Sequence, residues 1–143
     1  MTLNKIKIKK LHPDATIPTR AHSTDAGLDL YALEEVYFDC ETKLVKTGIA
    51  VDIPPGYEGQ VRPRSGMTLK SEFRVQLGTI DSGYTGDIGV IVDSSHHTGF
   101  INVGAKIAQL VISPIETPSV EVVEEFESES ARGSNGFGST GER

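Results

Sequence analysis

Short apolar runs alternate with polar residues along most of the chain, a pattern that predicts β-strands rather than helices. Apolar side chains occupy every second position at Ile6 and Ile8, and again at Val36 and Phe38. Alternation with this period places successive side chains on opposite faces of a sheet. Similar apolar runs lie within 28–33, 44–53, 88–92, 106–115 and 120–126. The chain is therefore predicted to be all-β.

Glycine and proline separate these apolar runs. Pro54-Pro55-Gly56, Ser82-Gly83 and Pro114 mark turns between them, and only 65–73 is predicted to carry a short helix. Many short strands separated in this way are typical of an antiparallel barrel or a two-sheet sandwich.

Composition narrows the class of protein. The chain has 143 residues, which suits one domain, and its 20 acidic and 14 basic side chains give a net charge of −6. That charge argues against direct binding of nucleic acid. Cys40 has no second cysteine to pair with, and no apolar run is long enough to span a membrane. We therefore expect a cytoplasmic protein without membrane contact.

The end of the chain differs from the rest in composition. After Phe126 the sequence is mostly Gly, Ser, Glu and other polar residues, with too few apolar ones to form a core. We predict a β-domain over 1–126 and a flexible arm over 127–143. Glutamates cluster where the arm begins, and a solvated strand edge and linker is the simplest interpretation of them.

The arm contains glycines spaced as in a dinucleotide-binding fingerprint, at Gly136, Gly138 and Gly141. That fingerprint needs a strand before it and a helix after it, and only two residues follow Gly141, so we reject a dinucleotide site. The segment still offers donors for a phosphate and an aromatic face for a base, although a flexible tail would have the same composition. These groups are the backbone N–H groups and the side chains of Arg132, Phe137, Ser139 and Thr140.

Two polar segments inside the β-domain carry related chemistry. Pro63-Arg64-Ser65-Gly66 offers donors for an anion beside a glycine that a ligand can approach closely. The segment from Gly78 to Gly86 places Asp81 in a glycine turn with Tyr84 three residues later, as a hairpin pocket with a carboxylate would require. Each segment also suits an ordinary surface turn.

Two strands each contain a polar residue among apolar neighbours. Asp29 lies between Leu28 and Leu30, and Gln109 lies in the run that begins at Lys106. A buried carboxylate needs a cationic partner or a metal ion nearby. Either polar side chain could instead simply face solvent.

Taken in order, five segments resemble the motifs of the homotrimeric dUTPase (dUTP diphosphatase) family. The resemblance implies a jelly-roll-like antiparallel β-barrel with a flexible C-terminal arm, assembled as a homotrimer whose active sites are shared among the chains. It also implies hydrolysis of dUTP to dUMP and diphosphate with Mg²⁺, which limits uracil in DNA and supplies dUMP for dTMP synthesis. The segments are Ala26-Gly27-Leu28-Asp29-Leu30, Pro63-Arg64-Ser65-Gly66, Gly78 to Gly86, Gly104 to Leu110 and Arg132 to Gly141.

The same resemblance implies roles for residues. Asp81 is expected to orient and deprotonate the water that attacks the α-phosphorus, and Asp29 to contact Mg²⁺ through water. Backbone groups of Thr79 and Ile80 are expected to select uracil, and Tyr84 to pack under the deoxyribose. The remaining substrate contacts are expected from Arg64, Ser65, Gly66, Gln109, Arg132, Gly138, Ser139 and Thr140, with Phe137 stacking on uracil.

Some positions depart from the family pattern. Val75 stands where many members have Asn, so a side-chain contact to uracil is missing unless backbone groups or Gln76 replace it. Asp87 stands where Glu is common. His96-His97 is expected in an exposed loop, in preference to a metal site.

Other functions share parts of the pattern. A dCTP deaminase would need a catalytic glutamate after the hairpin, and 88–93 contains none. A nucleotide-binding regulator would contact a protein partner, and the loop predicted over 94–100 is where such a partner is possible. An inert sandwich would leave the segment from Arg132 to Gly141 unexplained.

Overall fold

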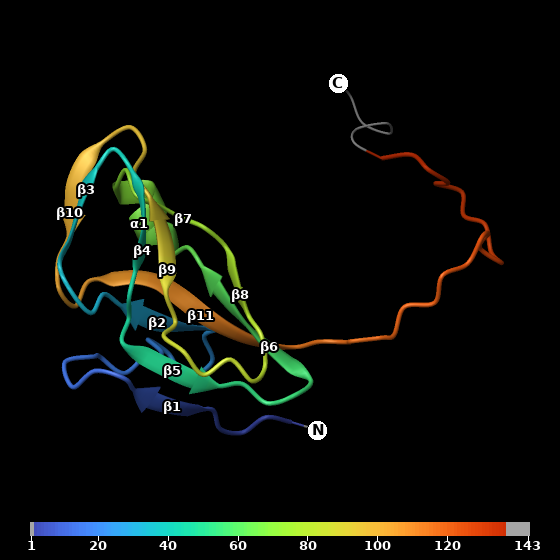
Figure 1. Ribbon diagram of the computed structural model, residues 1–143, viewed down its shortest axis with the longest axis horizontal. Helices are drawn as coiled ribbons and strands as arrows, with labels where there is room; N and C mark the ends of the chain where they lie inside the picture. The colour runs from blue at the N-terminus through green and yellow to red at the C-terminus, as the bar shows by residue number, and fades with distance from the viewer. Residues whose placement is uncertain (1, 137–143) are drawn as a thin grey trace.

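Strands make up nearly all the regular structure in the computed structural model, which describes residues 2–136 (Figure 1). Within that range one short helix, α1 (Ser65–Lys70), interrupts the strands, as expected for 65–73. The all-β prediction is therefore confirmed. The strands are β1 (Lys7–Lys10), β2 (Gly27–Tyr31), β3 (Val36–Asp39), β4 (Thr42–Val45), β5 (Ile49–Asp52), β6 (Tyr57–Arg62), β7 (Arg74–Val75), β8 (Gly78–Ile80), β9 (Val90–Asp93), β10 (Thr98–Ile101) and β11 (Lys106–Pro114).

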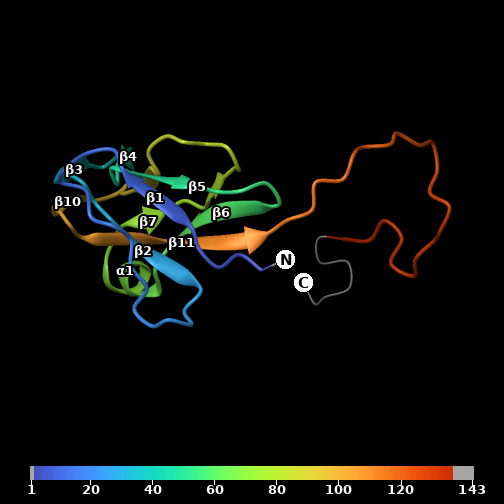
Figure 2. The same ribbon diagram turned by 90° about the horizontal axis from the view of Figure 1, so that it is seen from below.

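The strands pair in four antiparallel sheets that pack against one another (Figure 2). The largest sheet has the order β2-β11-β6-β8, and a second has the order β4-β9-β7. Two further pairs are β1-β5 and β10-β3. Over residues 2–136 these sheets do not close into one barrel, so only the antiparallel part of the predicted architecture is found.

Burial in the core alternates along the strands with a period of two. In β9, Val90 and Val92 are fully buried, whereas Ile91 between them is 45% exposed. In β6, Gly59 and Val61 are buried and the polar residues between and beside them project from the opposite face. Full burial of one such aliphatic side chain stabilises a fold by roughly 1.5–3 kcal/mol, so this alternation fixes the face and register of each strand.

Helix α1 continues from the end of β6. Arg64 has an extended backbone with φ −98° and ψ 137°, and the helix begins at the next residue. The carbonyl oxygen of Arg64 accepts a hydrogen bond from the backbone N–H of Thr68 at 3.1 Å. The turn thus presents Arg64, Ser65 and Gly66 at one end of the largest sheet. Neither α1 nor any other segment of residues 2–136 forms a helix long and apolar enough to cross a membrane.

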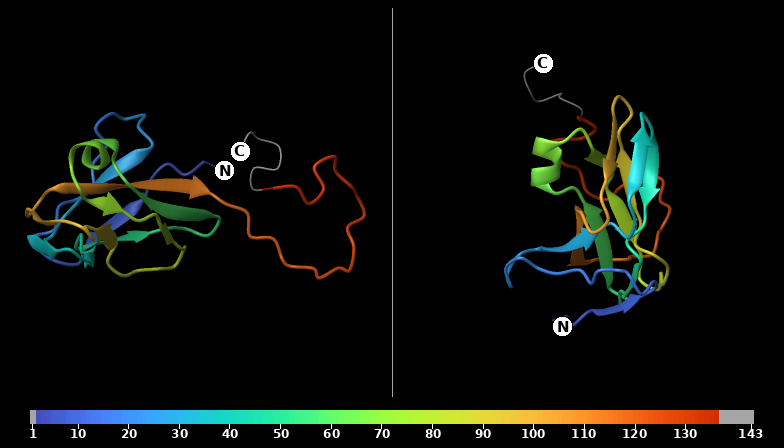
Figure 3. Two further views of the ribbon diagram at one scale, coloured as in Figure 1. Left: turned by 90° about the horizontal axis from the view of Figure 1, so that it is seen from above. Right: turned by 90° about the vertical axis from the view of Figure 1, so that its left-hand side faces the viewer.

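Two predicted boundaries differ from the structure. The loop expected over 94–100 ends earlier, because Thr98 begins β10, which pairs with β3. The prediction of a strand over 120–126 is wrong, since residues 115–136 lead away from the sheets (Figure 3). Val120 and Val122 are 89% and 92% exposed, and a strand requires a hydrogen-bonded neighbour that this segment lacks in the described part of the chain. The domain boundary at 126 stays a prediction.

Candidate active site

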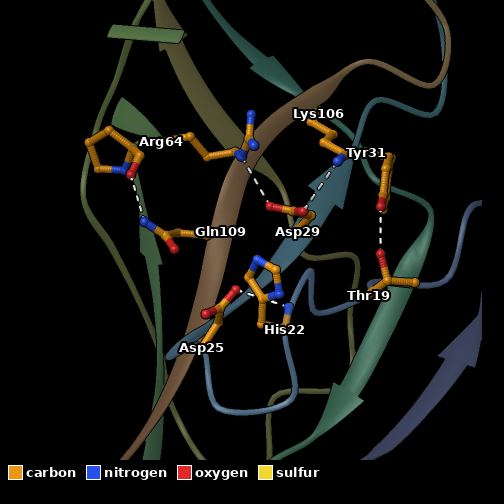
Figure 4. A network of polar contacts seen from close by, with 9 residues as sticks. Thr19, His22, Asp25, Asp29, Tyr31, Arg64, Lys106 and Gln109 are labelled. Atoms are coloured by element: carbon orange, nitrogen blue, oxygen red, sulfur yellow. Dashed lines mark hydrogen bonds and ion pairs between the residues drawn. The ribbon is translucent and has the colours of Figure 1, made fainter. Parts of the chain in front are cut away.

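The pairing of β2, β11 and β6 brings three predicted segments to one end of the largest sheet. Asp29 lies opposite Gln109, and Gln109 lies opposite Arg62. Paired residues of neighbouring strands lie about 5 Å apart and project from the same face. Arg64 follows two residues after Arg62, and its side chain reaches the same end of the sheet (Figure 4).

Asp29 is a buried carboxylate held by two cations. Its Oδ1 accepts a hydrogen bond from Nε of Arg64 at 3.0 Å, and its Oδ2 lies 3.6 Å from Nζ of Lys106. The side chain is 12% exposed, which excludes the solvent-facing alternative, and the two partners offset the cost of burying its charge. Within residues 2–136, the terminal amino groups of Arg64 have no hydrogen-bond partner, so they remain available to an anion.

Gln109 is also fixed in place. Its Nε2 donates a hydrogen bond to the carbonyl oxygen of Pro63 at 3.0 Å, which joins β11 to the turn before α1. Gly27 on β2 leaves room for this amide, because a Cβ at Gly27 would lie 2.1 Å from Oε1 of Gln109. A glycine is required here for close approach rather than for a left-handed backbone.

These residues line a polar cavity of about 350 Å³. Five of the residues predicted for substrate or metal therefore line one cavity, with Asp29 buried and Ser65 and Gly66 exposed at its surface. Two neighbours were not expected here from the sequence: Asp25, which lies in the loop before β2 and lines the cavity, and Lys106, which begins β11 beside Asp29. Charged residues usually face solvent. The lining consists of Ala21, Asp25, Ala26, Gly27, Asp29, Arg64, Ser65, Gly66 and Gln109.

A second hollow of about 380 Å³, the hairpin cavity, contains the other predicted residues of the β-domain. Asp81 and Tyr84 form a turn in which the N–H of Tyr84 donates to the carbonyl oxygen of Asp81 at 3.2 Å. Both side chains are exposed and line the hollow. Leu44 and Lys46 were not predicted here, because they come from a different strand and its turn. The lining consists of Leu44, Lys46, Gly78, Thr79, Ile80, Asp81, Tyr84, Asp87, Gly89 and Ile91.

The two cavities lie at opposite ends of β6. Gly59 pairs with Ile80, so Asp81 follows near the Tyr57 end of β6, whereas Arg64 follows the Arg62 end. About six residues of extended chain separate these positions, which corresponds to roughly 20 Å. One chain therefore does not bring Asp81 and Arg64 to the same small site.

Residues 115–136 line neither cavity in a single chain. Arg132 is exposed, and its Nε donates to the carbonyl oxygen of Asn135 at 2.6 Å. Residues 115–136 extend away from the sheets (Figure 1). Phe137, Gly138, Ser139 and Thr140 lie outside the described residues.

The loop that carries His96 and His97 lies at another part of the chain, after β9. Hydrogen bonds from Ser95 and then from Thr42 hold the pKa of the Asp93 carboxyl below its usual range. Nε2 of His97 lies 3.4 Å from a carboxylate oxygen of Glu72, and both side chains are exposed. Neither histidine lines the polar cavity or the hairpin cavity.

Comparisons with a family model and with known proteins point to the same family. A dUTPase family model matches residues 13–141. A deoxyuridine 5'-triphosphate nucleotidohydrolase of Clostridioides difficile is 48% identical over 140 residues, which cover 95% of this chain and 97% of that protein. A protein of the same name from Gloeothece citriformis is 47% identical over 141 residues and covers 96% of this chain and 97% of its own length.

Solved structures agree with this similarity. The dUTPase of Staphylococcus bacteriophage 80alpha with dUpNHpp has a TM-score of 0.94 and 36% identity, covering 97% of this chain and 99% of that one. A mutant dUTPase of the Staphylococcus aureus phage phi11, described with a structural Mg(II) ion, has a TM-score of 0.84 and 35% identity, covering 87% of this chain and all of that one. The match across nearly the whole chain leads to one conclusion: this chain belongs to the dUTPase family.

Proposed function

We propose that this chain hydrolyses dUTP to dUMP and diphosphate by attack of water on the α-phosphorus. The observation that carries the proposal is the polar cavity, where the separate segments of Asp29, Arg64 and Gln109 meet. Its donors suit a polyphosphate, and the hairpin cavity supplies a carboxylate beside groups for a base and a sugar. Family membership gives this combination a specific substrate.

The polyphosphate is proposed to bind in the polar cavity. Nε of Arg64 is engaged by Asp29, so its free amino groups can meet phosphate oxygens without losing that anchor. Charge-assisted hydrogen bonds from arginine to phosphate are strong and directional. Ser65, Gly66 and Gln109 complete the donor set at the same end of the sheet.

Asp81 is proposed as the general base. Its exposed carboxylate can accept a proton from water, although an aspartate is a weak base and positioning must supply much of the rate. The backbone of Thr79 and Ile80 is proposed to select uracil, because a fixed pattern of donors and acceptors leaves cytosine with unpaired groups. Tyr84 is proposed to pack under deoxyribose and to exclude a ribose 2′-hydroxyl.

The donor set fits a Mg²⁺ ion that is bound mainly by phosphate and water. Within residues 2–136, no group of three or more His, Cys, Asp or Glu could hold a metal ion. Mg²⁺ keeps several waters and often uses only one or two carboxylates together with substrate phosphates. Asp29, whose oxygens face Arg64 and Lys106, suits a contact through water. When bound, the ion would offset negative charge on the phosphates.

We further propose that a homotrimer forms each site from several chains. The roughly 20 Å that separates Asp81 from Arg64 in one chain supports a site in which the two come from different copies. The extended segment with exposed Val120 and Val122 and intervening Glu121 supports contact with a neighbour. Exposed lysines on β1, which pairs only with β5 in the described chain, offer opposite charge. The arm with Arg132 and Phe137 is proposed to close over a neighbour's substrate.

Turnover of dUTP, dCTP, dTTP and UTP with Mg²⁺ tests the activity. We expect dUMP and diphosphate from dUTP and little turnover of the other three. A uracil-containing product from dCTP would instead identify a deaminase. Sedimentation measured on the same sample tests the assembly, and a species that stays monomeric at micromolar concentration contradicts shared sites.

A further inference from the structure

Asp87 is a half-buried carboxylate near the end of the loop over 81–89, which joins β8 to β9, and it has no role in the proposed hydrolysis. Its Oδ2 accepts a hydrogen bond from the backbone N–H of Gly48 at 2.7 Å, and its Oδ1 accepts one from the N–H of Thr47 at 3.2 Å. Hydrogen bonds to an ionised acceptor are roughly twice as strong as those between neutral groups. The side chain of Asp87 therefore ties the loop to the turn between β4 and β5.

The turn that Asp87 contacts is rigid. Thr47 is 1% exposed, and its Oγ1 donates to the carbonyl oxygen of Ile88 at 2.7 Å. Gly48 has a left-handed φ of +75°, and a Cβ there would lie 2.9 Å from the Cβ of Ala15. Since the core fixes this backbone, the two N–H groups form a stable anchor for the carboxylate.

The backbone of Asp87 in turn holds Tyr84. The Tyr84 hydroxyl donates to the carbonyl oxygen of Asp87 at 2.9 Å. Gly86 leaves room for this contact, because a Cβ at that position would lie 2.5 Å from the hydroxyl oxygen. A continuous set of contacts thus runs from the buried turn through Asp87 to a side chain that lines the hairpin cavity.

The end of the loop is also held at Ile88, whose N–H donates to the carbonyl oxygen of Ile49 at 2.9 Å and whose side chain is fully buried. β8 ends at Ile80 and β9 begins at Val90, and the residues between them belong to no strand. Asp81 and Tyr84 are both exposed. The position of their turn therefore depends on contacts at the loop's end, where Asp87 lies.

We infer that Asp87 is a positioning residue: by fixing the loop to Thr47 and Gly48, it sets the orientation of Tyr84 and hence the choice between deoxyribose and ribose. This inference rests on the proposed function, in which Tyr84 packs under the deoxyribose. Asp87 itself touches neither the sugar nor the reacting phosphate in this account, and acts through Tyr84.

The test compares kcat/KM for dUTP and UTP in Asp87→Ala and Asp87→Asn. For Asp87→Ala we expect kcat/KM for dUTP to fall by about 10- to 100-fold and the preference for dUTP over UTP to fall by about 10-fold, because a displaced tyrosine no longer excludes the 2′-hydroxyl. Asp87→Asn keeps one acceptor oxygen and should lie between Asp87→Ala and the natural chain. Asp52→Ala removes an exposed carboxylate on β5 and should leave both quantities unchanged.

Tyr84→Phe supplies a second approach if Asp87→Ala does not fold. Removing the hydroxyl breaks the contact to Asp87, so the effects on dUTP preference of Tyr84→Phe and Asp87→Asn should be non-additive in the double variant. An unchanged preference for dUTP in folded Asp87→Asn and in Tyr84→Phe overturns the inference, even if the melting temperature falls.

Amide hydrogen exchange separates this inference from the proposed activity. Asp87→Asn should speed exchange at the N–H groups of Thr47 and Gly48 and across 81–89, whatever the protein hydrolyses. Failure of the natural chain to hydrolyse dUTP would reject the proposed function, whereas unchanged exchange in Asp87→Asn would reject the anchoring by Asp87.

Discussion

The polar cavity and the hairpin cavity differ in how their functional residues are held. Asp29 and Gln109 belong to paired strands, and Asp29 is 12% exposed between two cations. Asp81 and Tyr84 lie on an exposed loop, and the carboxylate of Asp81 has no hydrogen bond to another residue within 2–136. The polar cavity is thus part of the folded framework, whereas the reactive side of the hairpin cavity is oriented by a few contacts at its edge. Substitutions in the hairpin cavity should therefore lower activity with little loss of stability, whereas substitutions in the polar cavity should lower both.

The largest expected effect is on the hairpin side. Asp81→Asn removes the proposed base without removing a structural contact, so kcat for dUTP should fall by about 10³-fold. The melting temperature and the affinity for dUTP should stay close to those of the natural chain. Steady-state kinetics, calorimetry and binding of a non-hydrolysable dUTP analogue measure the three quantities. Turnover near the natural rate would show that another group acts as base.

In the polar cavity, activity and stability should fall together. Arg64→Met removes a phosphate donor and leaves Asp29 with Lys106 alone, so kcat/KM should fall by about 100-fold. Breaking a fully buried ion pair costs about 3–5 kcal/mol, and the partial exposure of Arg64 reduces the expected loss of stability to about 1–2 kcal/mol. Denaturant unfolding measures it. Lys106→Met is the matched control, because that more exposed partner should cost less than 1 kcal/mol.

Gly27→Ala should have a smaller effect confined to the polar cavity. The new methyl group would displace the amide of Gln109 from its contact with Pro63, so KM for dUTP should rise by about 10-fold with little change in kcat. Gln109→Ala in the same background should then add little, since the amide has already moved. Full additivity of the two substitutions would contradict this account of Gly27.

The smallest effect concerns a carboxylate outside both cavities. Hydrogen bonds from Ser95 and Thr42 lower the pKa of Asp93 in the folded chain, so its ionised form favours folding above the pKa of the unfolded chain. This contribution is lost as the pH falls through the lower, folded value. The melting temperature of the natural chain should therefore exceed that of Asp93→Asn at neutral pH and approach it below about pH 4, with kcat/KM at neutral pH unchanged. A constant difference across this pH range would exclude the titration of Asp93 as its source.

The strands that the sequence predicted best are those with two unlike faces. In β1, the half-buried Ile8 lies between the exposed Lys7 and Lys9, and this alternation is visible in the sequence itself. β6 was not predicted as a strand, because its polar residues alternate with Gly59 and Val61 rather than with large apolar side chains. The run at 120–126 has strand composition but no partner in the described chain, and composition alone does not supply one.

The candidate site was predictable in its parts but not in its grouping. Asp29, Arg64 and Gln109 are far apart in sequence, and only the family resemblance joined them before strand pairing was known. Lys106 was missed because its contact depends on the position of β2 beside β11. The contacts of the Asp87 carboxylate could not be predicted from the sequence either, since its partners are backbone N–H groups of a turn that is distant along the chain.

The placement of the two cavities at opposite ends of β6 has a genetic consequence. If each site takes Asp81 from one chain and Arg64 from the next, two inactive variants can restore activity in each other's presence. In a closed ring of three randomly mixed Asp81→Asn and Arg64→Met chains, about one quarter of the sites would contain both natural residues. Equal mixing after unfolding and refolding should therefore recover roughly that fraction of dUTP turnover, whereas sites built within single chains would recover none.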